Sequence, residues 1–202
     1  PLTDFNTANI NFIQVADVDG DGDMDILTQE GGAATAVTLW TNNGSGSFSS
    51  SIVITTGVPG LNISATGAKF ADFDNDGDLD YYQWVLGAAN DIYYVNNGSG
   101  SFSIGTLPLT DFNTSNINFM QVADVDNDGD IDILTQEGGS GTAVTLWTNN
   151  GSGSFTSSTA ITTGVTGLNI SAAGAKLADF DNDGDLDYYQ WVSGAANDIF
   201  YA

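Results

Sequence analysis

The chain has 202 residues, 41% of them apolar, and 26 acidic residues against two lysines give it a formal net charge of −24. A chain of this length can bury a core. It lacks the basic side chains that bind nucleic acids and anionic membranes. It also contains no apolar run of about 18 residues, the length that a membrane-spanning helix needs. Cysteine and histidine are absent, which excludes disulfides, thiolate or imidazole metal sites, and Ser-His-Asp or Cys-His catalysis.

The first repeat of the chain predicts β-strands separated by an acidic loop and a tight turn. Short runs rich in β-branched and aromatic residues lie at residues 12–16, 25–29 and 37–41, and a similar run follows at residues 92–95. The acidic loop covers residues 17–25, and the sequence NNGSGSF at residues 42–48 supplies residues that adopt positive φ in hairpins. No segment has a sustained helical period with caps. We therefore predict an all-β fold.

The sequence is a duplication with a second period inside each copy. Residues 1–95 align without gaps with residues 108–202, and 80 of these 95 positions are identical. Acidic loops begin at Asp17, Asp72, Asp124 and Asp179, which divides a single repeat domain into repeats of about 50 residues. Their predicted bounds are 1–55, 56–107, 108–162 and 163–202, the last repeat being truncated. One repeat cannot bury both of its faces, so neighbouring repeats must supply the core.

The four acidic loops share the pattern D-x-D-x-D-G-D-x-D and contain 20 of the 26 acidic residues. Carboxylates this close repel one another by roughly 1–4 kcal/mol per close pair, so we expect such a loop to close only around a cation. Hard oxygen ligands favour Ca²⁺ over Mg²⁺, and soft ligands for zinc or copper are absent. We predict four calcium ions, one per loop, with the metal-site residues Asp17, Asp19, Asp21, Asp23, Asp25, Asp72, Asp74, Asp76, Asp78, Asp80, Asp124, Asp126, Asp128, Asp130, Asp132, Asp179, Asp181, Asp183, Asp185 and Asp187.

Spacing assigns a role to each position of the loop. Positions 1, 3, 5 and 9 are predicted to bind through their carboxylates, and the glycine at position 6 allows a sharp turn. Position 7 should bind through its backbone carbonyl, with its side chain directed to solvent or to a bound water. The loop is not an EF-hand, because position 12 holds Thr28, Gln83, Thr135 or Gln190 in place of the required glutamate. The alternative of four solvated acidic turns leaves their near-regular spacing unexplained.

The string VADVDGDGDMDILTQ, followed by VTLWTNNGSGSF, resembles the VCBS/FG-GAP repeats, the calcium-binding blades of integrin-α-like β-propellers. The resemblance covers all four repeats. It implies a β-propeller-like array of four blades, each with three to four antiparallel strands and with calcium in a loop between two strands. It also implies a secreted or cell-surface protein that acts in adhesion, in glycan binding or as an accessory module of a secreted enzyme.

The last blade departs from this pattern. The second copy stops at Ala202, the equivalent of Val95, and so lacks the residues of one outer strand. We expect the segment around residues 1–9 to complete that blade. Within one chain this would close a ring, whereas between chains it would build a head-to-tail filament.

The leading hypothesis is therefore a calcium-stabilised, extracellular structural or adhesive protein that associates with itself or with other surface proteins. One rival is a calcium-dependent lectin, in which Trp40, Trp84, Trp147 and Trp191 stack on sugars, although we favour packing between blades for these side chains. The other rival is an accessory module of a larger secreted enzyme.

We expect no enzymatic activity from this chain itself. A glycosidase needs two carboxylates set across a cleft, and aspartates that bind calcium cannot serve. Glu30 paired with Asp4 or Asp91 would be a weak substitute.

Overall fold

The computed structural model describes residues 10–30, 37–54, 68–83, 92–105, 117–137, 144–161, 175–190 and 199–202. In these residues the regular structure consists of fifteen β-strands in four antiparallel sheets, as the sequence predicts. They include no helix that is long and apolar enough to cross a membrane. The chain divides into two compact units, one of Pro1–Asp72 and Asp76–Leu107, the other of Phe73–Asn75 and Pro108–Ala202.

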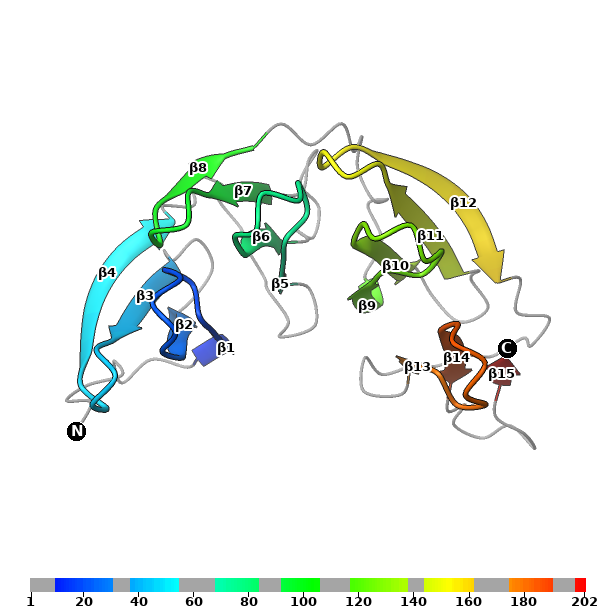
Figure 1. Cartoon of the computed structure of the whole chain (residues 1–202), viewed down its shortest axis with the longest axis horizontal. Helices are drawn as coiled ribbons and strands as arrows, with labels where there is room; N and C mark the ends of the chain where they lie inside the picture. The colour runs from blue at the N-terminus through cyan, green and yellow to red at the C-terminus, as the bar shows by residue number, and fades with distance from the viewer. Residues whose placement is uncertain are drawn as a thin grey trace. The chain divides into compact units, whose positions relative to one another are not determined.

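The first unit holds two four-stranded sheets, whose strands are labelled in Figure 1. The first sheet has the order β1 (Ile10–Ala16), β2 (Asp25–Glu30), β3 (Val37–Asn42), β4 (Phe48–Ile54). The second has the order β5 (Ala68–Ala71), β6 (Asp80–Gln83), β7 (Ile92–Asn96), β8 (Phe102–Ile104). Strands that follow one another in the chain are thus neighbours in the sheet, which is the up-and-down arrangement of a propeller blade.

The second unit repeats this plan with one strand fewer. Its first sheet has the order β9 (Ile117–Ala123), β10 (Asp132–Glu137), β11 (Val144–Asn149), β12 (Phe155–Ile161). Its second sheet contains β13 (Ala175–Ala178), β14 (Asp187–Gln190) and β15 (Ile199–Tyr201). The predicted blades of three to four antiparallel strands are confirmed, and so is the incomplete last blade. The predicted repeat bounds at residues 55, 107 and 162 lie outside the described residues.

A tight turn joins the third and fourth strands in each four-stranded blade. In the first blade Asn43 N donates to Ser47 O at 3.1 Å, and Asn43 Oδ1 accepts from the backbone N–H of Ser45 and of Ser47. Gly44 and Gly46 both have a φ of 74°. An asparagine that bonds its own turn and two glycines with positive φ explain why NNGSG forms this hairpin.

Each unit has a hydrophobic core that draws on both of its blades. In the first unit Leu27 and Leu39 pack with Tyr81 and Tyr94, and Val18 from the first acidic loop joins them. The corresponding cluster of the second unit contains Leu134, Val144, Ala175 and Tyr188. This agrees with the expectation that one blade needs its neighbour to bury its apolar faces.

A polar contact also joins the two blades of each unit. Gln14 on β1 donates its side-chain N–H to Ala68 O at 2.9 Å, and Gln121 on β9 donates to Ala175 O at 3.2 Å. These bonds place the first strand of one blade against the first strand of the next.

Candidate metal centres

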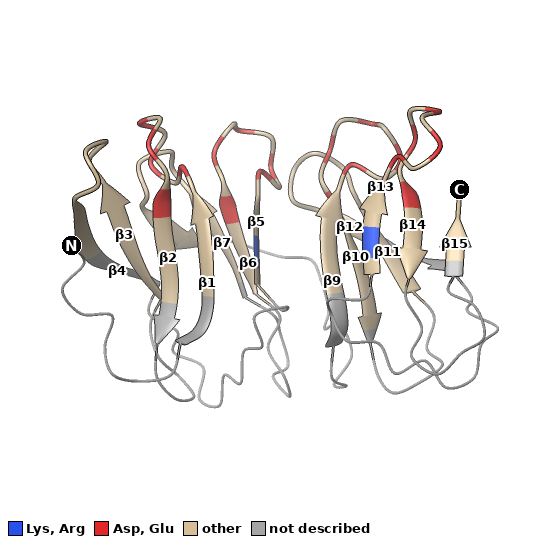
Figure 2. Ribbon diagram, turned by 90° about the horizontal axis from the view of Figure 1, so that it is seen from below, with Lys and Arg blue, Asp and Glu red and all other residues tan. Residues whose placement is uncertain are grey.

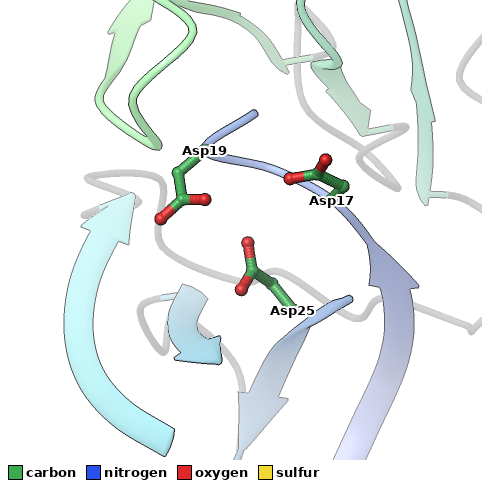
Figure 3. A group of neighbouring side chains, drawn as sticks. All are labelled: Asp17, Asp19 and Asp25. Atoms are coloured by element: carbon green, nitrogen blue, oxygen red, sulfur yellow. The ribbon is translucent and has the colours of Figure 1, made fainter. Parts of the chain in front are cut away.

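The acidic loops connect the first and second strands of each blade, and they lie at one end of the strands in each unit (Figure 2). In the first loop the carboxylates of Asp17, Asp19 and Asp25 point toward one another, with ligand oxygens within 4.8 Å (Figure 3). Asp17 and Asp19 follow β1, whereas Asp25 is the first residue of β2. The hairpin-like path of the loop thus brings positions 1, 3 and 9 to one point.

The same three positions converge in all four loops. The groups, each with oxygens within 4.8 Å of one another, are Asp17, Asp19 and Asp25; Asp72, Asp74 and Asp80; Asp124, Asp126 and Asp132; and Asp179, Asp181 and Asp187. The structure therefore brings together twelve of the twenty predicted aspartates, three in each loop.

Backbone hydrogen bonds to position 1 fix the shape of the loop. Asp17 Oδ1 accepts from Gly20 N at 2.9 Å, and Asp17 Oδ2 accepts from Gly22 N at 3.0 Å. Gly22 has a φ of 93°, a backbone conformation in which a residue with a side chain would be strained. Position 4 also has positive φ and is either glycine, as at Gly20, or asparagine, as at Asn75. The glycine at position 6 thus has the turning role that the sequence predicts.

Position 9 connects the metal-site carboxylates to the rest of the blade. Asp25 is fully buried, and its Oδ2 accepts from Val18 N at 3.1 Å while its Oδ1 accepts from Asn42 N at 2.8 Å. In the second blade Asp80 accepts from Asn96 N at 2.9 Å and from the hydroxyl of Tyr93 at 2.7 Å. The Asp25 carboxylate has about four acceptor positions, so its two bonds leave room for an ion.

Two observations on Asp19 indicate that the first loop favours a positive counter-charge. Burial raises the pKa of Asp19 above its usual range, and the negative charges of Asp25, Asp21 and Asp17 raise it further, against one backbone hydrogen bond. Asp19 Oδ1 is buried and accepts no hydrogen bond. A buried carboxylate oxygen that no N–H satisfies, beside two further carboxylates, is what a cation site requires. The residues therefore fit a hard divalent ion.

The third and fourth loops show the same tendency. Burial raises the pKa of Asp132, and the charges of Asp126 and Asp128 add to this, while the backbone N–H groups of Asn149 and Val125 oppose it. The pKa of Asp181 is also raised, first by desolvation and then by its acidic neighbours. The first, third and fourth loops thus each contain a carboxyl group whose ionised form is disfavoured without a counter-charge.

Positions 5 and 7 lie differently from the other three. The position 5 carboxylate accepts from the N–H of position 7, as in the 2.8 Å bond from Asp23 N to Asp21 Oδ1, and it is not part of the triad. The position 7 side chain was expected to face solvent or water, but it lies against the glycine of the NNG turn. A Cβ on Gly44 would lie 2.5 Å from the Asp23 carboxylate, and one on Gly98 would lie 2.5 Å from that of Asp78. The small glycine makes room for this carboxylate.

Sequence reasoning missed a set of asparagines that contact the loops. Asn96 Nδ2 donates to Val18 O at 2.8 Å and to Leu79 O at 3.2 Å. In the second unit Asn149 Nδ2 donates to Phe73 O at 2.8 Å and to Ile131 O at 3.1 Å. Each of these asparagines begins an NNGSG turn, and this repetition was the only sign of them in the sequence. The requirements of the turn explain the repetition equally well, so the contacts with the loops could not be inferred from it.

The two tryptophans that the structure describes each form a hydrogen bond within their own blade. Trp40 Nε1 donates to Thr28 Oγ1 at 2.9 Å, and Trp147 Nε1 donates to Thr135 Oγ1 at 3.0 Å. Both indoles are partly buried, and both threonines are fully buried. Trp84 and Trp191 lie outside the described residues.

Comparison with known proteins places these loops in a family. The model described as FG-GAP-like repeat matches residues 17–82 and 124–189, more than half of the chain and all four loops. No curated protein matches. Among solved structures, the chain is similar to an Agrocybe aegerita lectin that specifically recognises non-reducing terminal N-acetylglucosamine, with 23% identity and a TM-score of 0.63. The match covers 93% of this chain and 50% of that lectin, and it shows the fold, a β-propeller-like array of blades. The chain belongs to the FG-GAP-like repeat family.

Proposed function

We propose that each acidic loop binds one Ca²⁺ ion and that the ions hold the blades in their folded form. The recurrence of one carboxylate triad, at the same three positions of four loops, carries this proposal. An exposed acidic cluster is common without an ion, but here the position 9 carboxylate is buried in every loop. Moving several ionised groups this close together is unfavourable unless a cation lies among them.

The triad would supply three of the six to eight oxygen ligands that calcium takes. The carboxylate of position 5 and the backbone carbonyl of position 7 would complete the shell with water. Four bound ions would change the formal net charge from −24 to −16, which still favours solubility. Dissociation constants of roughly 10⁻⁴–10⁻³ M would suffice outside the cell, where calcium is plentiful.

Metal analysis and thermal melting test this function together. Protein dialysed against calcium should retain four ions per chain, and a chelator should lower the melting temperature. A site at 100 times its dissociation constant stabilises the fold by about 2.7 kcal/mol, and about 1 kcal/mol shifts the melting temperature by roughly 2–4 °C at this size. Loss of all four ions should therefore lower it by more than about 10 °C. An unchanged melting temperature without bound calcium would refute the proposal.

We further propose that the calcium-loaded blades form a structural or adhesive module outside the cell. The absence of cysteine leaves bound calcium as the means of rigidifying the loops. The family and the up-and-down blades support a role as a stable scaffold. Calcium dependence of surface adhesion, measured with the purified chain on a coated surface, tests this part of the proposal.

A second candidate is a calcium-dependent lectin, which the similarity to the Agrocybe aegerita lectin favours. A glycan array that includes terminal N-acetylglucosamine, run with calcium and with a chelator, tests it. The indole N–H groups of Trp40 and Trp147 already donate hydrogen bonds to threonines. We therefore expect Trp40→Ala to lower the stability of the fold without a specific effect on sugar binding. Trp84→Ala and Trp191→Ala are the variants that test a tryptophan platform. Sugar binding that all three variants leave unchanged would exclude tryptophan platforms.

A further inference from the structure

In the second unit, a side chain of one acidic loop reaches the acidic loop of the next blade. Asn127, at position 4 of the third loop, donates its amide N–H to the carboxylate of Asp185, at position 7 of the fourth loop, at 2.6 Å. Asn75, which clusters with the second unit, donates in the same way to Asp130 at 2.5 Å. A hydrogen bond to a carboxylate is stronger than one between neutral groups. Position 4 of one loop is therefore joined directly to position 7 of the next.

The first glycine of the NNGSG turn is the third part of this junction. A Cβ on Gly151 would lie 2.7 Å from the carboxylate of Asp130 and 3.0 Å from Nδ2 of Asn75. The amide and the carboxylate thus meet directly over the turn of the blade that carries the acceptor. A larger residue in place of this glycine would enter the space that the bond occupies.

The first unit contains the same junction without the amide. A Cβ on Gly98 would lie 2.5 Å from the carboxylate of Asp78, and a Cβ on Gly20 would lie 3.5 Å from the carbonyl oxygen of Gly98. Gly20 is the equivalent of Asn127, and the two residues have similar φ values of 74° and 60°. Because Gly20 has no side chain, it cannot donate to Asp78. The two copies thus place the same backbone at this junction but differ in the group that would join the loops.

Both ends of the bond lie beside the groups that we propose as calcium ligands. Asn127 lies between Asp126, a member of the triad, and Asp128 at position 5. At the other end, the backbone N–H of Asp185 donates to the position 5 carboxylate of Asp183 at 3.0 Å. Position 7 is also the residue whose backbone carbonyl is expected to bind the ion. Order at either end of the bond therefore reaches the ligand groups of the other loop.

The bond can make the two loops favour each other's ion. A φ of 60° is uncommon for a residue other than glycine, so the surrounding loop must hold Asn127 in this conformation. An ion in the third loop would order that backbone and present the amide to Asp185. The fourth loop would then lose less conformational freedom when it binds its own ion, and its affinity would rise. By linkage, an ion in the fourth loop would raise the affinity of the third by the same factor.

We propose that the position 4 asparagine is a positioning residue that couples calcium binding in successive loops. Asn127 makes binding in the third and fourth loops mutually favourable, whereas Gly20 leaves the first and second loops without this coupling. The inference rests on the proposed function, because it concerns how the same sites fill as calcium rises. It implies that two copies with nearly the same sequence respond to calcium differently, the second over a narrower range of concentration.

The amide NMR signals of the position 6 glycines can report each loop separately. Gly184 N donates to Asp179 Oδ2 at 3.2 Å, so its signal should shift when the fourth loop binds an ion. Gly77 N donates to Asp72 Oδ2 at 2.9 Å and reports the second loop in the same way. Calcium chloride is titrated into the metal-free chain in about 0.15 M salt, which screens the acidic surfaces. The midpoint of each shift measures the affinity of that loop.

Asp126→Asn weakens the third site and shows whether the fourth depends on it. This variant should raise the calcium midpoint of Gly184 by about three- to tenfold, the net effect of one hydrogen bond. When Asn127→Gly is already present, Asp126→Asn should raise that midpoint by less than about twofold, because only a screened charge effect remains. Asn127→Gly keeps the net charge and tolerates the positive φ. A purely local effect of Asn127→Gly on the third loop would not change how the fourth loop responds to Asp126→Asn.

The first unit supplies the matched reverse experiment. Asp19→Asn, the equivalent of Asp126→Asn, should change the midpoint of Gly77 by less than about twofold in the wild-type background. When Gly20→Asn is already present, Asp19→Asn should raise this midpoint by about as much as Asp126→Asn raises that of Gly184. Gly20→Asn fits the site, because its Cβ would make an ordinary contact of 3.5 Å with Gly98 O. A gain of coupling in this unit cannot be explained by a loss of stability.

Each outcome bears on the inference. If Asp126→Asn moves the Gly184 midpoint equally with and without Asn127→Gly, the coupling does not pass through this asparagine and the inference alone is overturned. Strand signals that appear only together with the glycine signals would show that the whole chain folds with its ions as one unit, which also overturns it. If calcium shifts neither glycine signal, the proposed function fails and this inference fails with it.

Discussion

Phe73 and Phe180 occupy the same position of two acidic loops with identical sequences, yet Phe73 is 1% exposed and Phe180 is 50% exposed. Phe73 contacts Phe155, whereas Phe180 packs on Phe200 and Tyr189 of its own blade. The loops themselves agree, because Asn75 and Asn182, at the same position 4, have φ values of 59° and 63°. The loop geometry is therefore a local property of the nine residues, whereas their burial depends on a neighbouring blade.

The largest difference between the two loops should appear on truncation of this aromatic ring. Phe73→Ala should lower the free energy of unfolding by about 3–5 kcal/mol, the usual effect of removing a buried ring. Phe180→Ala should cost about 1 kcal/mol, the worth of its aromatic contacts. Urea denaturation of both variants at low concentration in calcium measures the difference, and equal losses would contradict the burial argument.

A second difference concerns position 9 of the same two loops. Asp80→Asn and Asp187→Asn should each remove one bound calcium ion, reducing the content from four to three. Asp80→Asn should be the more destabilising by about 1–3 kcal/mol, because Asp80 also accepts from the hydroxyl of Tyr93, where the second copy has Phe200. The extra loss should shrink when Tyr93→Phe is already present. An unchanged gap in that background would exclude the hydroxyl as its cause.

The asparagine contacts allow a smaller test of the same principle. Asn149→Ala breaks bonds to two carbonyls, one of them in a buried contact, and should cost about 1–3 kcal/mol. Asn42→Ala breaks two exposed bonds, one to Met24 O and one from Gly44 N, and should cost no more than about 1 kcal/mol in the monomer. Chemical denaturation at low protein concentration measures both. A larger loss for Asn42 would show that the first turn has a partner that the contacts described above do not include.

The smallest effect is a pH dependence of the metal-free protein. The pKa values of Asp19, Asp132 and Asp181 are raised in the folded loops, so the folded state without metal binds more protons than the unfolded chain. Stability from these groups is present below the usual pKa of 3.8 and is lost as the pH rises above it through the raised values. The metal-free chain should thus melt at a higher temperature near about pH 5 than near about pH 7.

Calcium should reverse this pH dependence, because it favours the ionised carboxylates. Melting curves recorded in buffer stripped of metal, with and without added calcium, check both signs. A metal-free protein that is less stable at the lower pH would show that other groups control its titration.

Much of the local structure could be predicted from sequence because its causes are local. The strand expected at residues 37–41 is β3, Val37–Asn42, and the run at residues 92–95 is β7, Ile92–Asn96. The convergence of positions 1, 3 and 9 follows from their spacing and from the glycine at position 6. The calcium ligand set itself stays a prediction.

The contacts between distant parts of the chain could not be predicted from the sequence and became visible only in the folded structure. The bond from Asn96 to Val18 joins residues 78 positions apart, so no loop pattern could reveal it. Position 5 looks equivalent to position 3 in the sequence, but its carboxylate accepts the N–H of position 7 and stays outside the triad. The expected role of residues 1–9 in completing the last blade lies outside the described residues.

The bond from Asn96 to the carbonyl of Val18 also has an evolutionary consequence. A backbone carbonyl is present whatever amino acid occupies position 2, so the receiving loop can change valine for phenylalanine without losing its acceptor. Such a junction depends on the asparagine of the turn and not on the side chain at position 2, so a duplicated blade keeps this bond without a matching substitution in the loop that accepts it.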